Sequence, residues 1–230
     1  NINQSNVLSN ANLLFTVDAG NTKSYSGSGT AWNDLALGNN LTLIGSPSYS
    51  STNGGCLVFD GTNHYAYIPN ANINSSFKSG YTTFSSIFVS EVFNTDTAWH
   101  ELYGFGDADN FIDVWYQSST GNFGNDACGH FPSTGTMGNL SPRFNIWAIT
   151  QNNSGSGQSK IYRNGNLIDT KSITNTQSSG SYDFCIGAQP DTKGYRTNMK
   201  VSALYIFKQV LTDTDILNIY NVLKVRYGTP

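Results

Sequence analysis

The two ends of the chain carry strand patterns that belong in a protein core. Residues 12–21 read NLLFTVDAGN, and residues 54–70 read GGCLVFDGTNHYAYIPN. Residues 200–228, KVSALYIFKQVLTDTDILNIYNVLKVRYG, join a strand pattern to the one convincing helix pattern of the sequence. Between these segments lie short alternating runs separated by turns rich in Gly, Ser and Asn, which is typical of antiparallel strands. A chain whose first and last strands both enter the core is typical of a closed β-sandwich.

Local signals add a hairpin and a helix to this outline. An Asn-Gly pair at 164–165 predicts a hairpin over 160–171, because both residues accept the left-handed backbone of a type I′ turn. Thr212 and Asp215 have the spacing of a capping box, which predicts a helix over 212–225. Further strand patterns occur at 41–44, 81–93, 99–106, 110–117, 144–152 and 181–188. The sequence therefore predicts an all-β fold, a jelly-roll sandwich of two antiparallel sheets with one C-terminal helix.

Composition favours one folded domain with a polar but weakly charged surface. Of the 230 residues, 12% are charged and 13% are aromatic, which is not the composition of a disordered chain. Residues 1–11 are polar and patternless, so we expect a leader or linker there and a single domain over 12–230. The first residue is Asn, not Met, which we interpret as a sign of processing or of a fragment. The net charge of −3 and the lack of a long apolar run predict neither nucleic acid binding nor membrane insertion.

The cysteines do not form a disulfide framework. Cys56, Cys128 and Cys185 are an odd number of widely spaced residues, so at least one thiol has no partner within the chain. No cysteine pair or Cys-x-x-His spacing suggests zinc. We expect three free thiols.

Four segments together resemble a known superfamily. They lie at 12–35, 54–70, 160–171 and 200–228. They are similar to the laminin-G-like branch of the concanavalin A-like lectin/glucanase superfamily, in the form found in phage and large-virus structural proteins and in secreted bacterial proteins. The chain departs from that pattern at Ala203, where the family more often has an acidic residue, and at Arg163, where a small β-branched residue is common. The resemblance implies a jelly-roll sandwich and does not by itself imply a ligand.

Paired carboxylates would indicate a glycoside hydrolase. Hydrolases of this superfamily resemble one another in an E-x-D-x-E or E-x-D-x-x-E string, which places the acid and the nucleophile on one strand face. Glu91 and Glu101 are the two glutamates of the chain and lie outside any such string. The one acidic cluster is Asp107, Asp109 and Asp113, and its first two members belong to a turn, where solvated carboxylates are common. We therefore expect the chain not to be an enzyme.

Aromatic and amide residues gather in one stretch of loops. Sugar rings stack on exposed aromatic side chains, while Asn and Asp bind sugar hydroxyls. The segment 121–136, GNFGNDACGHFPSTGT, is too long and too rich in special residues for a plain connector. The predicted glycan-binding residues are Asp107, Asp109, Asn110, Phe123, Asn125, Asp126, His130 and Phe131. Other aromatic candidates are Tyr25, His64, Trp99, Trp115, Tyr116 and Tyr195; the alternation leaves open whether the two tryptophans belong to the core.

Calcium is the metal that this sequence favours. It binds several oxygen ligands on loops, and Asp18 and Asp60 stand at the ends of two core strands. We expect a structural calcium ion at Asp18 and Asp60, with the 107–110 loop as a second location. The alternative for each residue is that it starts a turn before a glycine.

The favoured function is a non-catalytic, lectin-like module on a virion or cell surface that recognises host or extracellular glycans. The amide- and hydroxyl-rich surface and the resemblance both suggest an extracellular or virion-surface setting. The first alternative is a structural or decoration protein of a virus capsid or fibre, with virion proteins or further copies of the chain as partners. The second alternative is a glycan-degrading enzyme.

Overall fold

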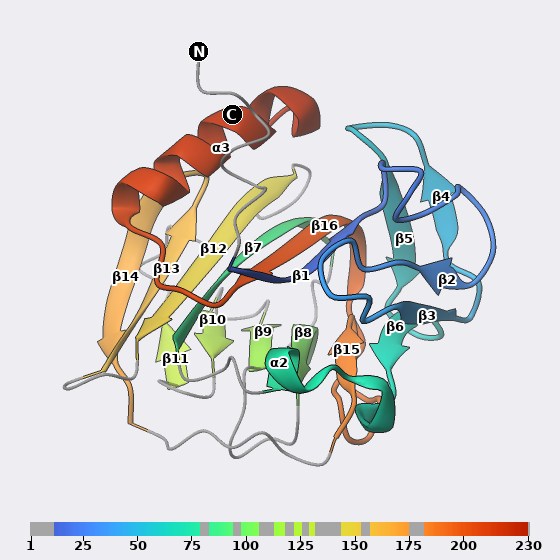
Figure 1. Cartoon of the computed structure of the whole chain (residues 1–230), viewed down its shortest axis with the longest axis horizontal. Coiled ribbons are helices and arrows are strands. Elements are labelled where there is room, and N and C mark those ends of the chain that lie inside the picture. The colour runs from blue at the N-terminus through green and yellow to red at the C-terminus, as the bar shows by residue number, and fades with distance from the viewer. Residues whose placement is uncertain are drawn as a thin grey trace.

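The structure is a computed structural model that describes residues 12–78, 83–93, 98–105, 113–117, 122–125, 129–131, 144–152, 157–174 and 182–229. Two antiparallel sheets pack face to face, and a long C-terminal helix lies on the outside of one of them (Figure 1). The predicted jelly-roll sandwich is thus confirmed. Residues 1–11 lie outside the described residues, so the predicted leader stays a prediction.

Sheet A contains the first and last strands of the described chain. Its order is β14 (Asn166–Ser172), β13 (Gln158–Arg163), β12 (Asn145–Asn152), β7 (Thr83–Val92), β16 (Asn198–Phe207), β5 (Cys56–Asp60) and β4 (Ser48–Ser50). The first strand, β1 (Leu13–Asp18), also pairs with β16, from Leu13 opposite Phe207 to Asp18 opposite Ala203. The first and last strands of the chain are therefore neighbours, as their core patterns predicted.

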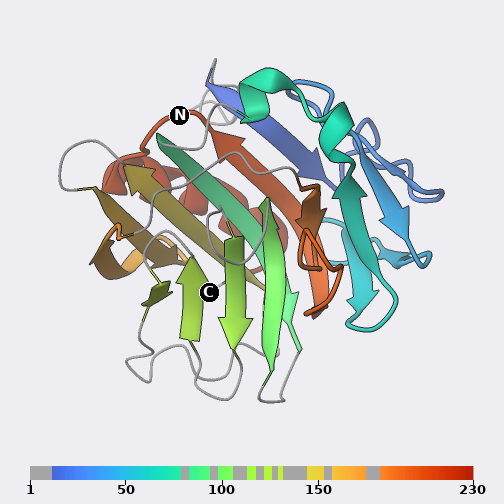
Figure 2. The same cartoon turned by 90° about the horizontal axis from the view of Figure 1, so that it is seen from below.

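Sheet B is the second layer and is seen from its own side in Figure 2. Its order is β11 (Gly129–Phe131), β10 (Asn122–Asn125), β9 (Asp113–Gln117), β8 (Trp99–Phe105), β15 (Phe184–Ile186), β6 (Tyr65–Ile68), β3 (Leu41–Ile44) and β2 (Ala31–Trp32). Strands from the middle of the chain thus lie beside strands from both ends. Side chains far apart in sequence come to share one surface.

Phenylalanine rings fill the space between the sheets. Phe15 from sheet A stacks on Phe77, with ring centroids 5.2 Å apart. Phe77 also meets Phe105 and Phe184 of sheet B, at 4.7 and 5.4 Å. Phe77 belongs to a one-turn helix, α2 (Ser75–Lys78), that follows the 3-10 turn η1 (Asn70–Asn72). The sequence did not predict these turns, which form where a buried ring anchors a polar connection.

The predicted hairpin and C-terminal helix are both present. Asn164 and Gly165 have φ angles of 51° and 78° between β13 and β14, as a type I′ turn requires. The helix α3 (Asp213–Tyr227) begins at the Thr212 capping box and ends at Gly228 in the left-handed conformation. Its buried side chains pack on the outer face of sheet A; they are Ile216, Ile219, Tyr220, Leu223 and Tyr227. Within the described ranges, no helix combines the length and apolarity that crossing a bilayer requires.

Two of the three cysteines lie in described segments and are free. Cys56 and Cys185 are both buried and not bonded to each other. Burial raises the pKa of the Cys185 thiol to about 12, so this thiol is chemically inert near neutral pH. The third, Cys128, lies outside the described residues.

Candidate functional site

The candidate site lies on the outer face of sheet B, because α3 covers the outer face of sheet A. Alternation assigns the side chains of β9 to the two faces: Val114 and Tyr116 belong to the core between the sheets, so Asp113 and Trp115 point outward. Trp115 pairs with Gly124 of β10. A Cβ atom on that glycine would lie 1.8 Å from the Trp115 ring, which shows that the indole lies over the glycine.

A β-bulge brings Glu101 onto the same face. Glu101 stands opposite Trp115, and the register between β8 and β9 shifts between Glu101 and Tyr103. Leu102 and Tyr103 consequently both face the core, while Glu101 stays outside. The ring of Trp99 meets that of Trp115 edge-on, with centroids 4.4 Å apart. Trp99, Glu101 and Trp115 therefore form one group on the outer face.

One oxygen of the Glu101 carboxylate is buried without a hydrogen-bond partner in the described part of the chain. Only 3% of the residue is exposed, and within the described part of the chain no donor reaches its Oε1 atom. Burying such a group costs free energy that the fold must supply elsewhere. An unsatisfied buried polar atom therefore requires an explanation.

The loop that joins β15 to β16 runs along the edge of this group. The Glu101 backbone N–H donates to the Tyr195 carbonyl at 2.8 Å, and the Thr197 hydroxyl donates to the Glu101 carbonyl. Lys193 and Tyr195 have φ angles of 58° and 45°, a strained conformation for residues other than glycine. The loop thus places the backbone of Tyr195 beside that of Glu101, and the Tyr195 side chain is 53% exposed.

Two cations lie on two tyrosine rings of β6. The Arg196 guanidinium lies 5.2 Å from the ring centroid of Tyr65, and the Lys193 ammonium lies 5.9 Å from that of Tyr67. The two tyrosine rings are 6.0 Å apart. Lys193 also forms an ion pair of 2.9 Å with Asp183. Burial opposes the charge on Lys193, but the bond to Asp183 outweighs it and raises the lysine pKa.

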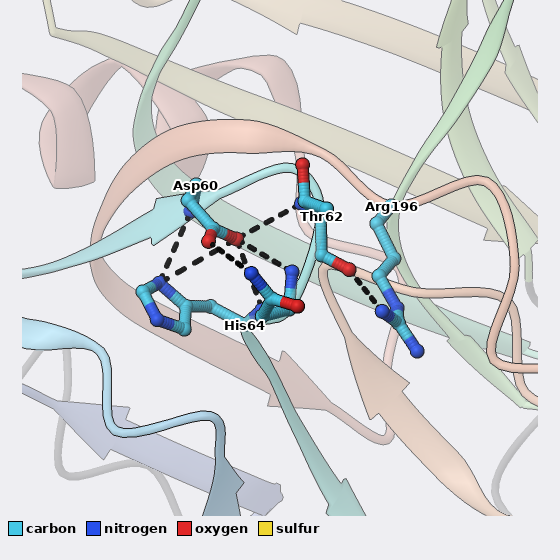
Figure 3. A network of polar contacts seen from close by, with 5 residues as sticks. Asp60, Thr62, His64 and Arg196 are labelled. Atoms are coloured by element: carbon cyan, nitrogen blue, oxygen red, sulfur yellow. Dashed lines mark hydrogen bonds and ion pairs between the residues drawn. The ribbon is translucent and has the colours of Figure 1, made fainter.

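The Asp60 loop fixes the Arg196 side chain from the other side (Figure 3). The Asp60 carboxylate accepts backbone hydrogen bonds from Thr62, Asn63 and His64 at 2.9, 2.7 and 3.1 Å. Arg196 Nη1 in turn donates to the Thr62 carbonyl, and Arg196 Nε donates to the Lys193 carbonyl at 2.9 Å. The guanidinium is therefore held in one position.

Asp60 is expected to stabilise the protein mainly at neutral pH. Burial opposes its ionisation, but the hydrogen bonds from Asn63, Thr62 and His64 outweigh burial and lower the pKa of the carboxyl. A group whose pKa falls on folding stabilises the native state above its usual value of about 4, and this contribution is lost as the pH drops further. Asp60→Ala should lower the free energy of unfolding by about 1 kcal/mol at pH 7. In urea titrations the difference in the free energy of unfolding between Asp60→Ala and wild type should become smaller below about pH 4.

The matched control is Asp169→Ala, because that carboxylate accepts one bond, from the backbone of its neighbour Thr170. A difference for Asp60→Ala that stays constant down to low pH would contradict this account of the Asp60 loop.

The two residues predicted to bind calcium form hydrogen bonds within the protein. Both oxygens of Asp18 bind the Arg226 guanidinium at 2.6 Å. The Asp60 carboxylate accepts hydrogen bonds from the backbone of its own loop. Their partners on β16, Ala203 and Asn198, are five residues apart, or roughly 16 Å along a strand. In the described part of the chain no three His, Cys, Asp or Glu side chains gather as metal ligands. Asp18 and Asp60 thus do not fit a shared calcium site.

Only some of the predicted glycan-binding residues lie in the described part of the chain. Phe123 is 1% exposed and stacks on Trp147 at 4.6 Å, so its ring belongs to the core. Asn125 is fully buried and donates to Gln151 across the sandwich. These two side chains cannot present a surface to a sugar, because alternation turns them inward. The backbone of His130 and Phe131 forms β11, whereas Asp107, Asp109, Asn110 and Asp126 lie outside the described residues.

The other aromatic candidates divide between core and surface. Tyr25 and Tyr116 are buried. Trp99 and Trp115 point to the outer face of sheet B, although Trp115 is only 7% exposed. Tyr195 is exposed in the adjoining loop, and His64 Nδ1 accepts a hydrogen bond from the Asp60 backbone N–H at 3.2 Å. Sequence reasoning missed Tyr65, Tyr67, Lys193, Arg196 and the position of Glu101. The alternation of residues 64–68 was a usable signal, since it places Tyr65 and Tyr67 on the same face.

Comparison with known proteins supports the fold. No protein-family model matches the sequence, and no curated protein matches it. The structure is similar to that of Trypanosoma rangeli sialidase in complex with sialic acid, with a TM-score of 0.65 and 16% identity over 95% of this chain and 34% of that chain. It is also similar to the botulinum neurotoxin serotype C1 binding domain, with a TM-score of 0.67 and 14% identity over 95% of this chain and 53% of that chain.

This chain therefore spans about a third of the sialidase and about half of the toxin binding domain. At such identities the likeness shows a shared two-sheet β-sandwich.

Proposed function

We propose that the chain is a non-catalytic carbohydrate-binding module that uses the outer face of sheet B. The observation that carries the proposal is an exposed aromatic residue, Tyr195, in a loop that also carries the fixed cations Lys193 and Arg196. The backbone of this loop is bonded to that of Glu101, at the sheet that α3 does not cover. Aromatic rings offer apolar faces for sugar C–H groups, and charged side chains bind hydroxyls. The similarity in fold to a sialidase that binds sialic acid supports this reading.

The site is built to hold its side chains in place before a ligand arrives. Arg196 is fixed by the Tyr65 ring and by two carbonyl oxygens, and Lys193 is fixed by Asp183. Preorganised groups lose little conformational freedom on binding, which favours affinity. We propose the setting to be extracellular or on a virion surface, in agreement with the laminin-G-like resemblance.

Replacement of the exposed ring should weaken glycan binding. On a glycan array, Tyr195→Ala should reduce binding of the recognised glycan about 5- to 10-fold, since an aromatic stacking contact contributes about 1 kcal/mol. Tyr49→Ala is the matched control, because Tyr49 is 37% exposed on β4 of the other sheet, and it should bind as wild type does. An array without any binding, together with tight association with a virion protein, would favour the structural or decoration alternative.

One observation favours hydrolysis as a second candidate function. Glu101 pairs with Trp115, and Asp113 pairs with Gly104, on the outer face of two adjacent strands. Diagonal neighbours in a sheet are about 7–8 Å apart, and the two carboxyls of glycosidases lie about 5–9.5 Å apart. Release of reducing ends from a polysaccharide, lost in both Glu101→Gln and Asp113→Asn, would establish this function and overturn the non-catalytic proposal.

A further inference from the structure

We infer that Glu101 is the residue that recognises sugar hydroxyls, and that the sugar bound beside it is neutral. This inference rests on the proposed function and extends it to a ligand class. It starts from a contrast between the two glutamates of the chain. Both are buried, with 4% of Glu91 and 3% of Glu101 exposed, but their partners differ.

Glu91 has the cation that a buried carboxylate requires. Its Oε2 atom lies 2.9 Å from the Lys200 ammonium. Glu101 forms no ion pair with the part of the chain that the structure describes, and its Oε1 accepts no hydrogen bond there. The bulge at Leu102 places Glu101 outside the core, so this carboxylate is not a by-product of core packing. The protein carries a costly group at the centre of an aromatic surface.

Sugar hydroxyls supply what the carboxylate lacks. An ionised carboxylate only accepts hydrogen bonds, and bonds to a charged acceptor are stronger than bonds between neutral groups. Trp115 lies opposite Glu101 and meets the ring of Trp99, but Trp115 is only 7% exposed. Apolar ring surface for the same sugar would therefore come from Trp99 and from the exposed Tyr195 of the adjoining loop. Trp99 is the more exposed of the two tryptophans, so we place the entry to the carboxylate at its ring.

An acidic sugar would bring a third negative charge to Glu101 and Asp113. The nearby cations are already engaged, Lys193 by Asp183 and Arg196 by two backbone carbonyls, which favours a neutral sugar.

The same substitution in both glutamates tests this inference. Glu101→Gln keeps the shape of the side chain and removes a buried charge for which the described residues supply no cation, so the melting temperature should rise by about 2–4 °C. Glu91→Gln removes a charge that Lys200 compensates, so the melting temperature should fall by a similar amount.

Glycan binding should weaken about 10- to 100-fold in Glu101→Gln and stay unchanged in Glu91→Gln. On an array of matched neutral and acidic glycans, the wild type should bind the neutral members.

The outcomes separate the two proposals. A wild type that binds no glycan would overturn the carbohydrate-binding function and this inference with it. A wild type that binds glycans while Glu101→Gln binds equally well would leave the function standing and overturn the role of Glu101. Preference for acidic glycans, or a lower melting temperature in Glu101→Gln, would also overturn the inference.

Discussion

Phe77→Ala should lower the free energy of unfolding by about 3–5 kcal/mol, the usual cost of removing a fully buried phenylalanine ring. The ring is 0% exposed and meets Phe15 of sheet A together with Phe105 and Phe184 of sheet B. Its loss would leave a cavity between the sheets that neither sheet can close alone. Calorimetry should show a melting temperature lower by on the order of 10 °C.

The control for this prediction is Ser75→Ala, two residues earlier in the same one-turn helix and exposed to solvent. It should melt within about 1–2 °C of wild type, because surface substitutions usually change stability by no more than about 0.5 kcal/mol. Equal stability of Phe77→Ala and wild type would contradict the placement of the Phe77 ring between the sheets.

Arg226→Ala should be the second most damaging substitution. The guanidinium binds both oxygens of Asp18 at 2.6 Å and the Gly54 carbonyl at 2.8 Å, and so ties the last turn of α3 to β1. Removing one partner of a buried pair leaves an uncompensated charge, which costs about 3–5 kcal/mol. The Arg226 side chain is 35% exposed, so we expect a smaller loss of about 2 kcal/mol.

Urea unfolding measures this loss, with Lys224→Ala as the matched control. Lys224 lies on the same turn, and its ammonium lies 5.2 Å from the Tyr220 ring, so its removal should cost less than about 1 kcal/mol. Equal losses of unfolding free energy in the two variants would show that the Asp18 carboxylate does not depend on Arg226 as its partner. The sequence could not show that Asp18 binds a cationic side chain, because that partner comes from residue 226, 208 positions away in the sequence.

The fold could be predicted because its signals are local. The period of two in the strands, the Asn-Gly pair at 164–165 and the Thr212 capping box each act within a few residues, and each was read correctly. The short helix α2 was missed because its four residues contain one buried side chain, Phe77. A segment that short has no periodic pattern to detect.

The candidate site could not be predicted in the same way, because topology assembles it. Tyr65, Glu101 and Arg196 belong to β6, to β8 and to the loop before β16, and they become neighbours only in sheet B. The bulge at Leu102 adds a second obstacle. Strict alternation along WHELYGF would place Glu101 on the core side with Tyr103 and Phe105, so the sequence hides its outward position.

The loop that the sequence favoured as a binding site has a different role where it is described. Phe123 and Asn125 alternate with Gly124, which pairs with Trp115. Their inward direction follows from that register, which no single-strand pattern reveals. The composition of the 121–136 segment indicated the sheet that we propose as the binding site, but not which face the Phe123 and Asn125 side chains occupy.

We propose that the outer face of sheet B binds carbohydrate. A nuclear magnetic resonance titration of the labelled protein, with a glycan that the array identifies, tests it most directly. We predict that the perturbed backbone amides cluster at Tyr65–Tyr67, at Trp99–Glu101 and at 193–197, while those of α3 and β14 stay unchanged. Perturbations confined to α3 and the 160–171 hairpin would contradict the account, because they would place the ligand on the opposite side of the sandwich.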